Sequence, residues 1–320
     1  MAWWAAFRSR IAFSQSCSSA TMEFLIASNW PWIRLMRWMS LVWFSERLIP
    51  IYPAGYTKDA RKKMTPFPFS KSPVTELSQV PPYYVSNFGH WSGVTEYQEA
   101  GIHFLIEFAK HCRLRKNASI LEVGSGLGGS ILYWSHHFSP KQISAINLVG
   151  EQSNFAKQLF IENQVLVDPF LEGSWETMKI LPPNQYDFVF SVDAAYHFEN
   201  TKEFYRESFR VLQPGGKLVF NLFQSKQKIK SPFRSILKLF FIPKDQVKMV
   251  EDTMNDLEDI GFVIEKNQNW TNPVIDGFIQ NSKKMQFSLQ TFGSLLRIIT
   301  RSLGLQYHYY VVIKPNSVSL

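Results

Sequence analysis

Apolar and polar positions alternate in a regular way from about residue 83 to the end of the chain. Apolar stretches of strand length, the first of them "SILEVG", alternate with stretches whose apolar residues recur at helical spacing. Helices are expected at 95–112, 129–138, 151–163, 199–212 and 244–260, and strands at 142–148, 169–173, 186–192, 217–223 and 305–315. Strands that alternate with helices indicate an α/β domain whose mostly parallel, doubly wound sheet is covered by helices on both faces.

The first part of the chain does not share this pattern. Residues 1–64 are basic and rich in tryptophan and are expected to form a helical extension. Residues 65–82 are rich in proline and short polar runs, which is typical of a linker. The expected organisation is therefore an extension, a linker and one domain at 83–320.

Two segments of the extension bear on where the protein resides. Residues 1–22 contain two arginines, several serines and no acidic residue, which is typical of a mitochondrial transit peptide, or alternatively of a membrane-surface segment. Wound as a helix, 30–49 gathers arginines and serines on one side and tryptophans and methionines over the rest. Such a helix is expected either to lie at a bilayer interface or to pack on the main domain, and its charges argue against a spanning helix. A cytoplasmic, membrane-associated or mitochondrial location stays open.

Charge and cysteine content narrow the class of protein. The net charge is +8, and residues 1–64 carry nine Lys and Arg against three Asp and Glu, which leaves the main domain nearly neutral. A nucleic-acid-binding domain would carry basic residues along its binding face, so no nucleic acid is expected as a partner. Cys17 and Cys112 form no spacing typical of a disulfide framework or a metal site, and no metal is expected.

A glycine-rich loop, "ILEVGSGLGG" at 120–129, follows the first strong strand and precedes a helix. This arrangement places a ligand at the carboxyl edge of a parallel sheet. A phosphate-binding loop of the P-loop type is excluded because no lysine follows the glycines. Gly124, Gly126 and Gly129 do match the Gly-x-Gly-x-x-Gly pattern of dinucleotide-binding domains, so on these residues alone a dinucleotide remains an alternative.

The same loop resembles motif I of the class I S-adenosylmethionine-dependent methyltransferases. In that motif an acidic residue stands two positions before the first glycine of a Gly-x-Gly-x-Gly turn, as Glu122 does before Gly124, Gly126 and Gly128. The resemblance implies S-adenosylmethionine as the cofactor. Glycines let the backbone approach the methionyl part of that cofactor, which carries no phosphate and needs no lysine. The Glu122 carboxylate suits a ligand with an ammonium and a sulfonium group, and Ser125 is expected to contact the cofactor as well.

Residues that follow the next two strands continue the resemblance. Asn147 stands where both methyltransferases and NAD enzymes usually carry an acidic residue. NAD enzymes depend on that carboxylate for the ribose, which weakens the dinucleotide alternative, and the Asn147 amide can still bond to a ribose hydroxyl. Leu148 follows it, and Gln152 matches a glutamine of a subset of small-molecule methyltransferases. Ser174 and Trp175 stand where the family binds adenine, although Ser174 replaces the usual aspartate. All five are expected to contact the cofactor.

The remaining family segments also occur in order. "SVDAAYHF" supplies Asp193, a further expected cofactor contact, after the fourth strand. "LQPGG" resembles the family's turn, in which Pro214–Gly216 reverse the chain before the next strand. The resemblance covers about 83–315 and implies a Rossmann-like fold whose last strand, 307–313, runs antiparallel beside an otherwise parallel sheet.

The acceptor side of the site is expected around the start of the domain. "NFGHW" at 87–91 resembles the Asn-x-Gly-Tyr-Trp segment of methyltransferases that act on sterols, phosphoethanolamine, tocopherols and macrolides. Such a segment would cover the sulfonium and exclude water. Residues 224–243 are expected to form a substrate lid. The candidate substrate contacts are Tyr83, Tyr84, Trp91 and Tyr196, and the alternative is that they pack under a loop.

Methyl transfer needs alignment above all, and it needs a base only when the nucleophile must lose a proton. His197, after the fourth strand, is the first candidate for that base and His90 the second, although a lone histidine is more often structural. The leading hypothesis is a methyltransferase acting on a small, lipophilic acceptor. The alternatives are a protein or RNA methyltransferase of the same fold and a scaffold that has lost catalysis. Three basic, apolar segments, 30–49, 224–243 and 292–304, favour a lipid-soluble acceptor or membrane association.

Overall fold

The computed structural model of the chain describes residues 83–316, except for 228, 230–236, 238–241, 244 and 286, and except for the side chains of 287 and 288. The chain divides into two compact units, Met1–Pro66 and Phe67–Leu320, and every described residue belongs to the second. The expected extension, linker and helix at 30–49, and most of the expected lid, lie outside the described residues. The domain boundaries therefore stay predictions.

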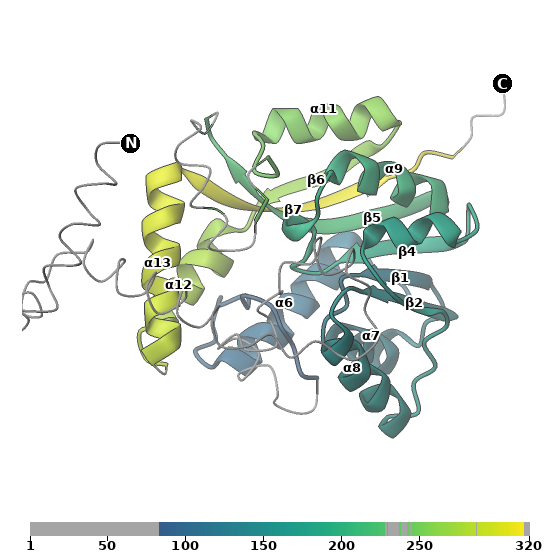
Figure 1. Cartoon of the computed structure of the whole chain (residues 1–320), viewed down its shortest axis with the longest axis horizontal. Coiled ribbons are helices and arrows are strands. Elements are labelled where there is room, and N and C mark those ends of the chain that lie inside the picture. Colours follow the sequence, from purple (N-terminus) through teal and green to yellow (C-terminus); the bar gives the residue numbers. More distant parts are fainter. Residues whose placement is uncertain are drawn as a thin grey trace, which may run out of the picture. The chain divides into compact units, whose positions relative to one another are not determined.

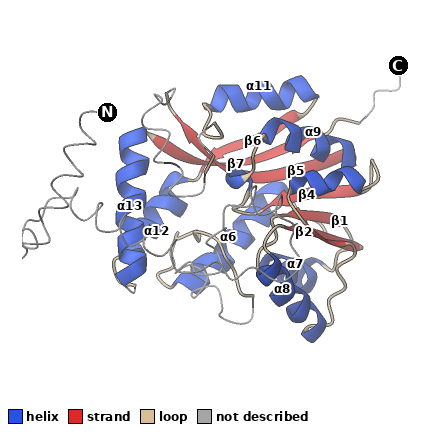
Figure 2. Cartoon of the chain, in the orientation of Figure 1, coloured by secondary structure: helices blue, strands red, loops and turns tan. Residues whose placement is uncertain are grey.

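The second unit is built on one sheet of seven strands in the order β3-β2-β1-β4-β5-β7-β6 (Figure 2). The strands are β1 Ser119–Val123, β2 Gln142–Asn147, β3 Phe170–Glu172, β4 Tyr186–Ser191, β5 Leu212–Ser225, β6 Val263–Asn269 and β7 Leu305–Ile313. β7 runs antiparallel to both of its neighbours, and the pairs from β3 to β5 are parallel. The expected fold class, a Rossmann-like sheet with an antiparallel last strand, is confirmed.

The strand order reverses between β1 and β4, which is the point where open α/β sheets bind ligands at their carboxyl edge. Two layers of helices enclose the sheet (Figure 1). The helices are α6 Tyr97–Cys112, α7 Gly129–Phe138, α8 Gly150–Glu162, α9 Thr201–Val211, α11 Val250–Ile260, α12 Gly277–Ser282 and α13 Phe287–Leu303. α6, α7 and α8 lie on one face and α9 and α11 on the other, as the alternating βα order requires.

Aromatic side chains form the core between the sheet and α6. The Phe108 ring meets Phe190 of β4 and Tyr309 of β7 edge to face, with centroids 5.3 Å away in both cases. Trp270 stacks on Tyr309 with centroids 4.3 Å apart. Rings of this size bury much of the apolar area that stabilises the domain, and truncation of one to alanine typically costs about 3–5 kcal/mol.

The structure corrects the boundaries expected around β5. The expected turn at Pro214–Gly216 lies inside the strand: Tyr186 pairs with Leu212 and Phe188 with Lys217, so the intervening residues bulge without leaving the sheet. β5 also continues to Ser225, so the first two residues of the expected lid belong to the sheet. α11 begins at Val250 rather than at 244, and most of the basic, apolar segment 292–304 belongs to α13, which begins at Phe287.

Candidate active site

Three glycines in the left-handed region turn the chain from β1 into α7. The φ angles are +83° at Gly124, +56° at Gly126 and +83° at Gly128. A Cβ atom on Gly124 would lie 2.7 Å from the Ala194 side chain, and one on Gly128 would lie 2.6 Å from the Phe160 ring. A Cβ atom on Gly126 would meet no heavy atom within 4 Å. Two of the glycines are thus required by packing, and the third faces open space at the carboxyl edge of the sheet.

Asn147, at the end of β2, holds this loop in place. Its Oδ1 accepts a hydrogen bond of 3.1 Å from the Gly126 N–H. Its Nδ2 donates to the Val149 carbonyl at 3.2 Å and to the Ser153 hydroxyl at 3.1 Å. The side chain is buried, so the amide ties the glycine loop to the start of α8. An aspartate in its place could accept from Gly126 but could not donate to Val149.

Asp193 is the centre of a second group of hydrogen bonds, after β4. It adopts a left-handed conformation with φ of +52°, which turns its carboxylate toward the start of the domain. The Phe88 N–H donates to Oδ2 at 2.9 Å, and the Tyr307 hydroxyl donates to Oδ1. The Tyr196 hydroxyl also bonds to this carboxylate. Burial raises the pKa of Asp193 to about 6, although these hydrogen bonds lower it. One carboxylate therefore joins three segments that are far apart in sequence.

Aromatic rings continue from Asp193 across the carboxyl ends of β4 and β5. Phe223 of β5 lies 5.0 Å from Tyr196 and 5.9 Å from Phe88, between ring centroids. Phe88 also stacks on Phe292 of α13 at 6.4 Å, with the planes 7° apart. These rings form a packed cluster called here the aromatic wall, in which Phe88 and Phe292 are half-buried and the others are buried. Its members are Phe88, Tyr196, Phe223, Phe278, Phe292 and Tyr307.

Similarity to known proteins agrees with this geometry. A protein family described as a methyltransferase domain matches residues 121–220. The chain is 28% identical over 135 residues to the erythromycin 3''-O-methyltransferase of Saccharopolyspora erythraea, covering 41% of this chain and 44% of that protein. It is 33% identical over 110 residues to the sterol 24-C-methyltransferase of Pneumocystis carinii, covering 34% of this chain and 28% of that protein. A solved geranyl diphosphate methyltransferase shares the fold, with a TM-score of 0.65 and 13% identity over 77% of this chain and 96% of that one.

Residues 121–220 match a methyltransferase domain, and the relatives support a class I S-adenosylmethionine-dependent methyltransferase. The expected cofactor is confirmed at the level of this family. The chain spans less than half the length of each of the two relatives, so the activity of the whole protein and its acceptor are taken up as proposals below.

The residues of the glycine loop fit the cofactor of a methyltransferase. The loop carries no basic side chain, as a ligand without phosphate requires. Gly126 faces space that no protein atom fills. The Ser125 hydroxyl is buried and has no hydrogen-bond partner among the described residues, so it is free to bond to a ligand.

We expect Ser125→Ala to weaken binding of S-adenosylmethionine by about fivefold to tenfold, the ~1 kcal/mol of one hydrogen bond. The same change should leave the unfolding temperature unchanged or slightly higher, because the hydroxyl bonds to nothing in the protein. Titration calorimetry and thermal unfolding measure the two quantities. Ser130→Ala is the matched control, since it removes a hydroxyl that bonds to Glu122 and should lower stability. Equal stability losses in the two variants would contradict the assignment.

Glu122, expected to face the cofactor, is bonded to α7 instead. Its carboxylate is buried and accepts from the Ser130 hydroxyl and, at 2.8 Å, from the Trp134 Nε1–H. Burial raises its pKa to about 7, against the effect of the two hydrogen bonds, which lower it. Both oxygens have protein donors, so we assign Glu122 the role of orienting α7 beneath the glycine loop.

The raised pKa of Glu122 predicts how stability depends on pH. The ordinary value is 4.5, so the folded state holds this proton more tightly than the unfolded state does. The contribution of Glu122 to the free energy of unfolding is fully present below about pH 4.5. It is lost as the pH rises through about 7, and the loss amounts to up to about 3 kcal/mol. Glu122→Gln, which cannot ionise, should remove that share of the pH dependence. Urea unfolding of both proteins between pH 5 and 8 measures it, and parallel curves would contradict it.

Four other expected cofactor contacts lie near the loop with different surroundings. Leu148 is 44% exposed, and the Gln152 side chain makes no hydrogen bond among the described residues. Ser174 caps a short helix, where its hydroxyl accepts from the Glu176 N–H at 3.3 Å. Trp175 is buried, and its indole N–H donates to the Glu199 carbonyl at 2.8 Å. Leu148 and Gln152 therefore remain accessible to a ligand, whereas Trp175 contacts protein.

Three of the residues expected around the acceptor pack against protein. The Tyr83 hydroxyl bonds to His137 Nε2 at 2.9 Å, and Tyr84 meets the Phe155 ring edge to face. Trp91 is buried, and its Nε1–H donates to the Phe88 carbonyl at 2.8 Å. Trp91 therefore fixes the position of Phe88, which sequence reasoning did not single out although it lies inside the motif "NFGHW".

The two histidines proposed as bases lie in different places. His197 is half-buried beside Tyr196, with ring centroids 4.3 Å apart, at the edge of the aromatic wall. The His90 ring lies 4.8 Å from His103 of α6 and 5.5 Å from Trp270. Burial lowers the pKa of His90 to about 4, and the neighbouring His103 lowers it further. His90 thus belongs to the packing on α6, and His197 as a base stays a prediction.

Proposed function

We propose that the protein transfers a methyl group from S-adenosylmethionine to a small, lipophilic acceptor bound against the aromatic wall. The observation that carries the proposal is the continuity of the glycine loop with that wall. The Cβ of Gly124 would lie 2.7 Å from Ala194, which directly follows Asp193, and Asp193 bonds to Phe88 and Tyr307 of the wall. A ligand at the loop and an acceptor at the wall would therefore be neighbours.

The chemistry of the wall supports an apolar acceptor. Its six members are aromatic, and the two half-buried rings, Phe88 and Phe292, offer apolar faces and edges to a ligand. The relatives' names support a small-molecule acceptor. Sterols and geranyl diphosphate have large apolar parts, whereas phosphoethanolamine is polar. A nearly neutral domain favours such an acceptor over RNA.

The protein's own residues would act mainly by alignment. When bound, S-adenosylmethionine would supply an activated methyl group for in-line attack by an acceptor atom, with its sulfur as the leaving group. Phe88, held by Asp193, would cover the reacting atoms and exclude water. His197, half-buried beside Tyr196, would accept the proton of a hydroxyl acceptor. For an acceptor that loses no proton, His197 would serve only to shape the site.

Transfer of labelled methyl groups tests the proposal. The full chain is incubated with S-adenosylmethionine labelled on the methyl group and with a total lipid extract, and the label is followed into the organic phase. We expect label in a lipid-soluble product with the wild type and none with Gly126→Val. Label that appears only on protein or RNA, or no transfer to any fraction, would contradict the proposal.

A further inference from the structure

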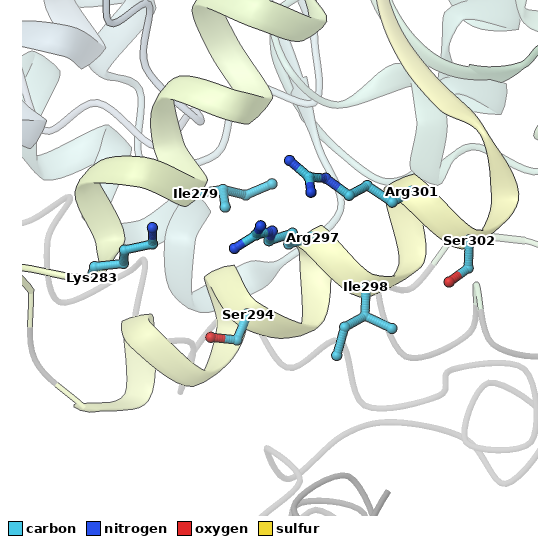
Figure 3. Close-up of a pocket in the computed structure, with 7 residues that line it drawn as sticks. All are labelled: Ile279, Lys283, Ser294, Arg297, Ile298, Arg301 and Ser302. Atoms are coloured by element: carbon cyan, nitrogen blue, oxygen red, sulfur yellow. The ribbon is translucent and has the colours of Figure 1, made fainter. Parts of the chain in front are cut away.

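A surface cavity of about 380 Å³ lies between α12 and α13, away from the glycine loop. Three cations line it: Lys283, which follows α12, and Arg297 and Arg301, one turn apart on α13. Figure 3 shows both guanidinium groups on the side of α13 that faces Ile279 and Lys283. The cavity is therefore a basic one, built by two helices that pack on each other.

No acidic side chain balances these cations nearby in the sequence. Asp276 is the last acidic residue of the chain, and every charged residue after it is Lys or Arg. Within the described part of the chain, no ion pair joins Lys283, Arg297 or Arg301 to a carboxylate. All three side chains are exposed. Unpaired cations around one cavity attract an anion, and no described residue supplies it.

The cavity also has an apolar component. Ile279 lines it from α12, and Ile298 of α13 is 45% exposed beside the two arginines. α13 is amphipathic, since Leu289, Leu295 and Ile299 are buried while the arginines face outward. A helix with cations and an exposed aliphatic side chain on its outer face matches the boundary between phospholipid headgroups and acyl chains.

We propose that the outer face of α13, with Lys283, docks on a bilayer of anionic phospholipid, one headgroup phosphate entering the cavity. Exposed cations hold a single free anion weakly, whereas a charged bilayer offers many anions at once. The described residues that line the cavity include no aromatic ring on which bases could stack, which disfavours single-stranded nucleic acid. None of the helices in the described part of the chain has the length and apolar run needed to cross a bilayer, so the proposed contact is with the surface only.

The same helix would link the bilayer to the acceptor site. Phe292, on the inner side of α13, stacks on Phe88 of the aromatic wall. A bilayer at the outer face would therefore lie one helix away from the proposed acceptor position. The docking proposal goes beyond the proposed function and does not depend on it, because binding to vesicles can be measured without any methyl transfer.

Co-sedimentation of the full chain with vesicles tests this proposal. Phosphatidylcholine vesicles are compared with vesicles that also contain phosphatidylserine. We expect binding only to the latter, weakened roughly 25-fold in Arg297→Gln/Arg301→Gln, because each cation near an anionic surface contributes roughly fivefold. Arg297→Lys/Arg301→Lys should keep most of the binding, since it keeps the charge. Lys116→Gln/Lys141→Gln, at two exposed positions away from α13, changes the net charge equally and should bind like the wild type.

Several results would overturn the proposal. One is a wild type that does not bind phosphatidylserine vesicles, and another is equal binding by the wild type and the double glutamine variant. A third is an equal loss in the Lys116/Lys141 variant, which would show an effect of net charge alone. Binding of an oligonucleotide through Arg297 and Arg301, without binding of vesicles, would assign the cavity to nucleic acid instead. None of these results bears on methyl transfer in solution, which is measured separately.

Discussion

Gly126→Val is expected to abolish measurable binding of S-adenosylmethionine, with a loss of at least about 100-fold, or ~3 kcal/mol. Gly126 is the glycine of the loop whose Cβ position is open, so a branched side chain there would occupy the space assigned to the cofactor. Its φ of +56° adds about 1–2 kcal/mol of backbone strain for any L-residue. Titration calorimetry measures the affinity, and thermal unfolding measures the strain separately.

A second glycine provides a matched control for this change. Gly304, between α13 and β7, has a φ of +60°, and its Cβ position is likewise free of heavy atoms within 4 Å. Gly304→Val should therefore cost a similar amount of stability and leave the affinity for S-adenosylmethionine as it is. Equal affinity losses in the two variants would show that strain, not occupancy of the site, explains the effect. Retained affinity in Gly126→Val would contradict the placement of the cofactor.

Asp193→Ala is expected to destabilise the domain by about 3 kcal/mol or more and to lower methyl transfer. It removes the one acceptor shared by the Phe88 N–H and the hydroxyls of Tyr196 and Tyr307. A buried donor left without a partner costs about 1–3 kcal/mol. The start of the domain would also lose its attachment to the end of β4, so Phe88 would no longer be held over the site. Urea unfolding and the rate of label transfer measure the two effects.

Two controls distinguish the role of Asp193 from that of an ordinary carboxylate. Tyr307→Phe removes a single donor and should cost only about 1–2 kcal/mol, since Phe88 and Tyr196 keep their acceptor. Asp259→Ala removes an exposed carboxylate that pairs with Lys202 and should cost less than about 1 kcal/mol. If Asp193→Ala were no more costly than Asp259→Ala, Asp193 would not join the three segments as described.

Features encoded by neighbouring residues could be predicted from the sequence. The glycine loop, the strand before it and the helix after it form one local pattern, and α7 begins and ends at the expected residues, Gly129 and Phe138. The parallel order of the strands follows from their alternation with helices. Pro214–Gly216 misled the prediction because proline and glycine usually mark a turn, whereas the pairing of Lys217 with Phe188 keeps these residues within β5 as a bulge.

Contacts between distant segments could not be predicted. Nothing near Asp193 in the sequence indicates that Tyr307, 114 residues later, donates to it. Phe223 and Phe292 form part of the aromatic wall only because the ends of β5 and α13 meet Phe88. Trp91 is of a residue type expected to contact a substrate, but its indole is buried against protein. Residue type identified candidates for the site, and the fold decides which of them face it.

Titration calorimetry of the full chain with S-adenosylmethionine and with NAD tests the central claim most directly. The glycine spacing alone is compatible with both ligands. The choice between them rests on Asn147, on the absence of a basic residue in the loop and on the match of residues 121–220 to a methyltransferase domain. We predict saturable binding of S-adenosylmethionine, lost in Gly126→Val, and no binding of NAD. Binding of NAD in preference to S-adenosylmethionine, or binding of neither, would contradict the account.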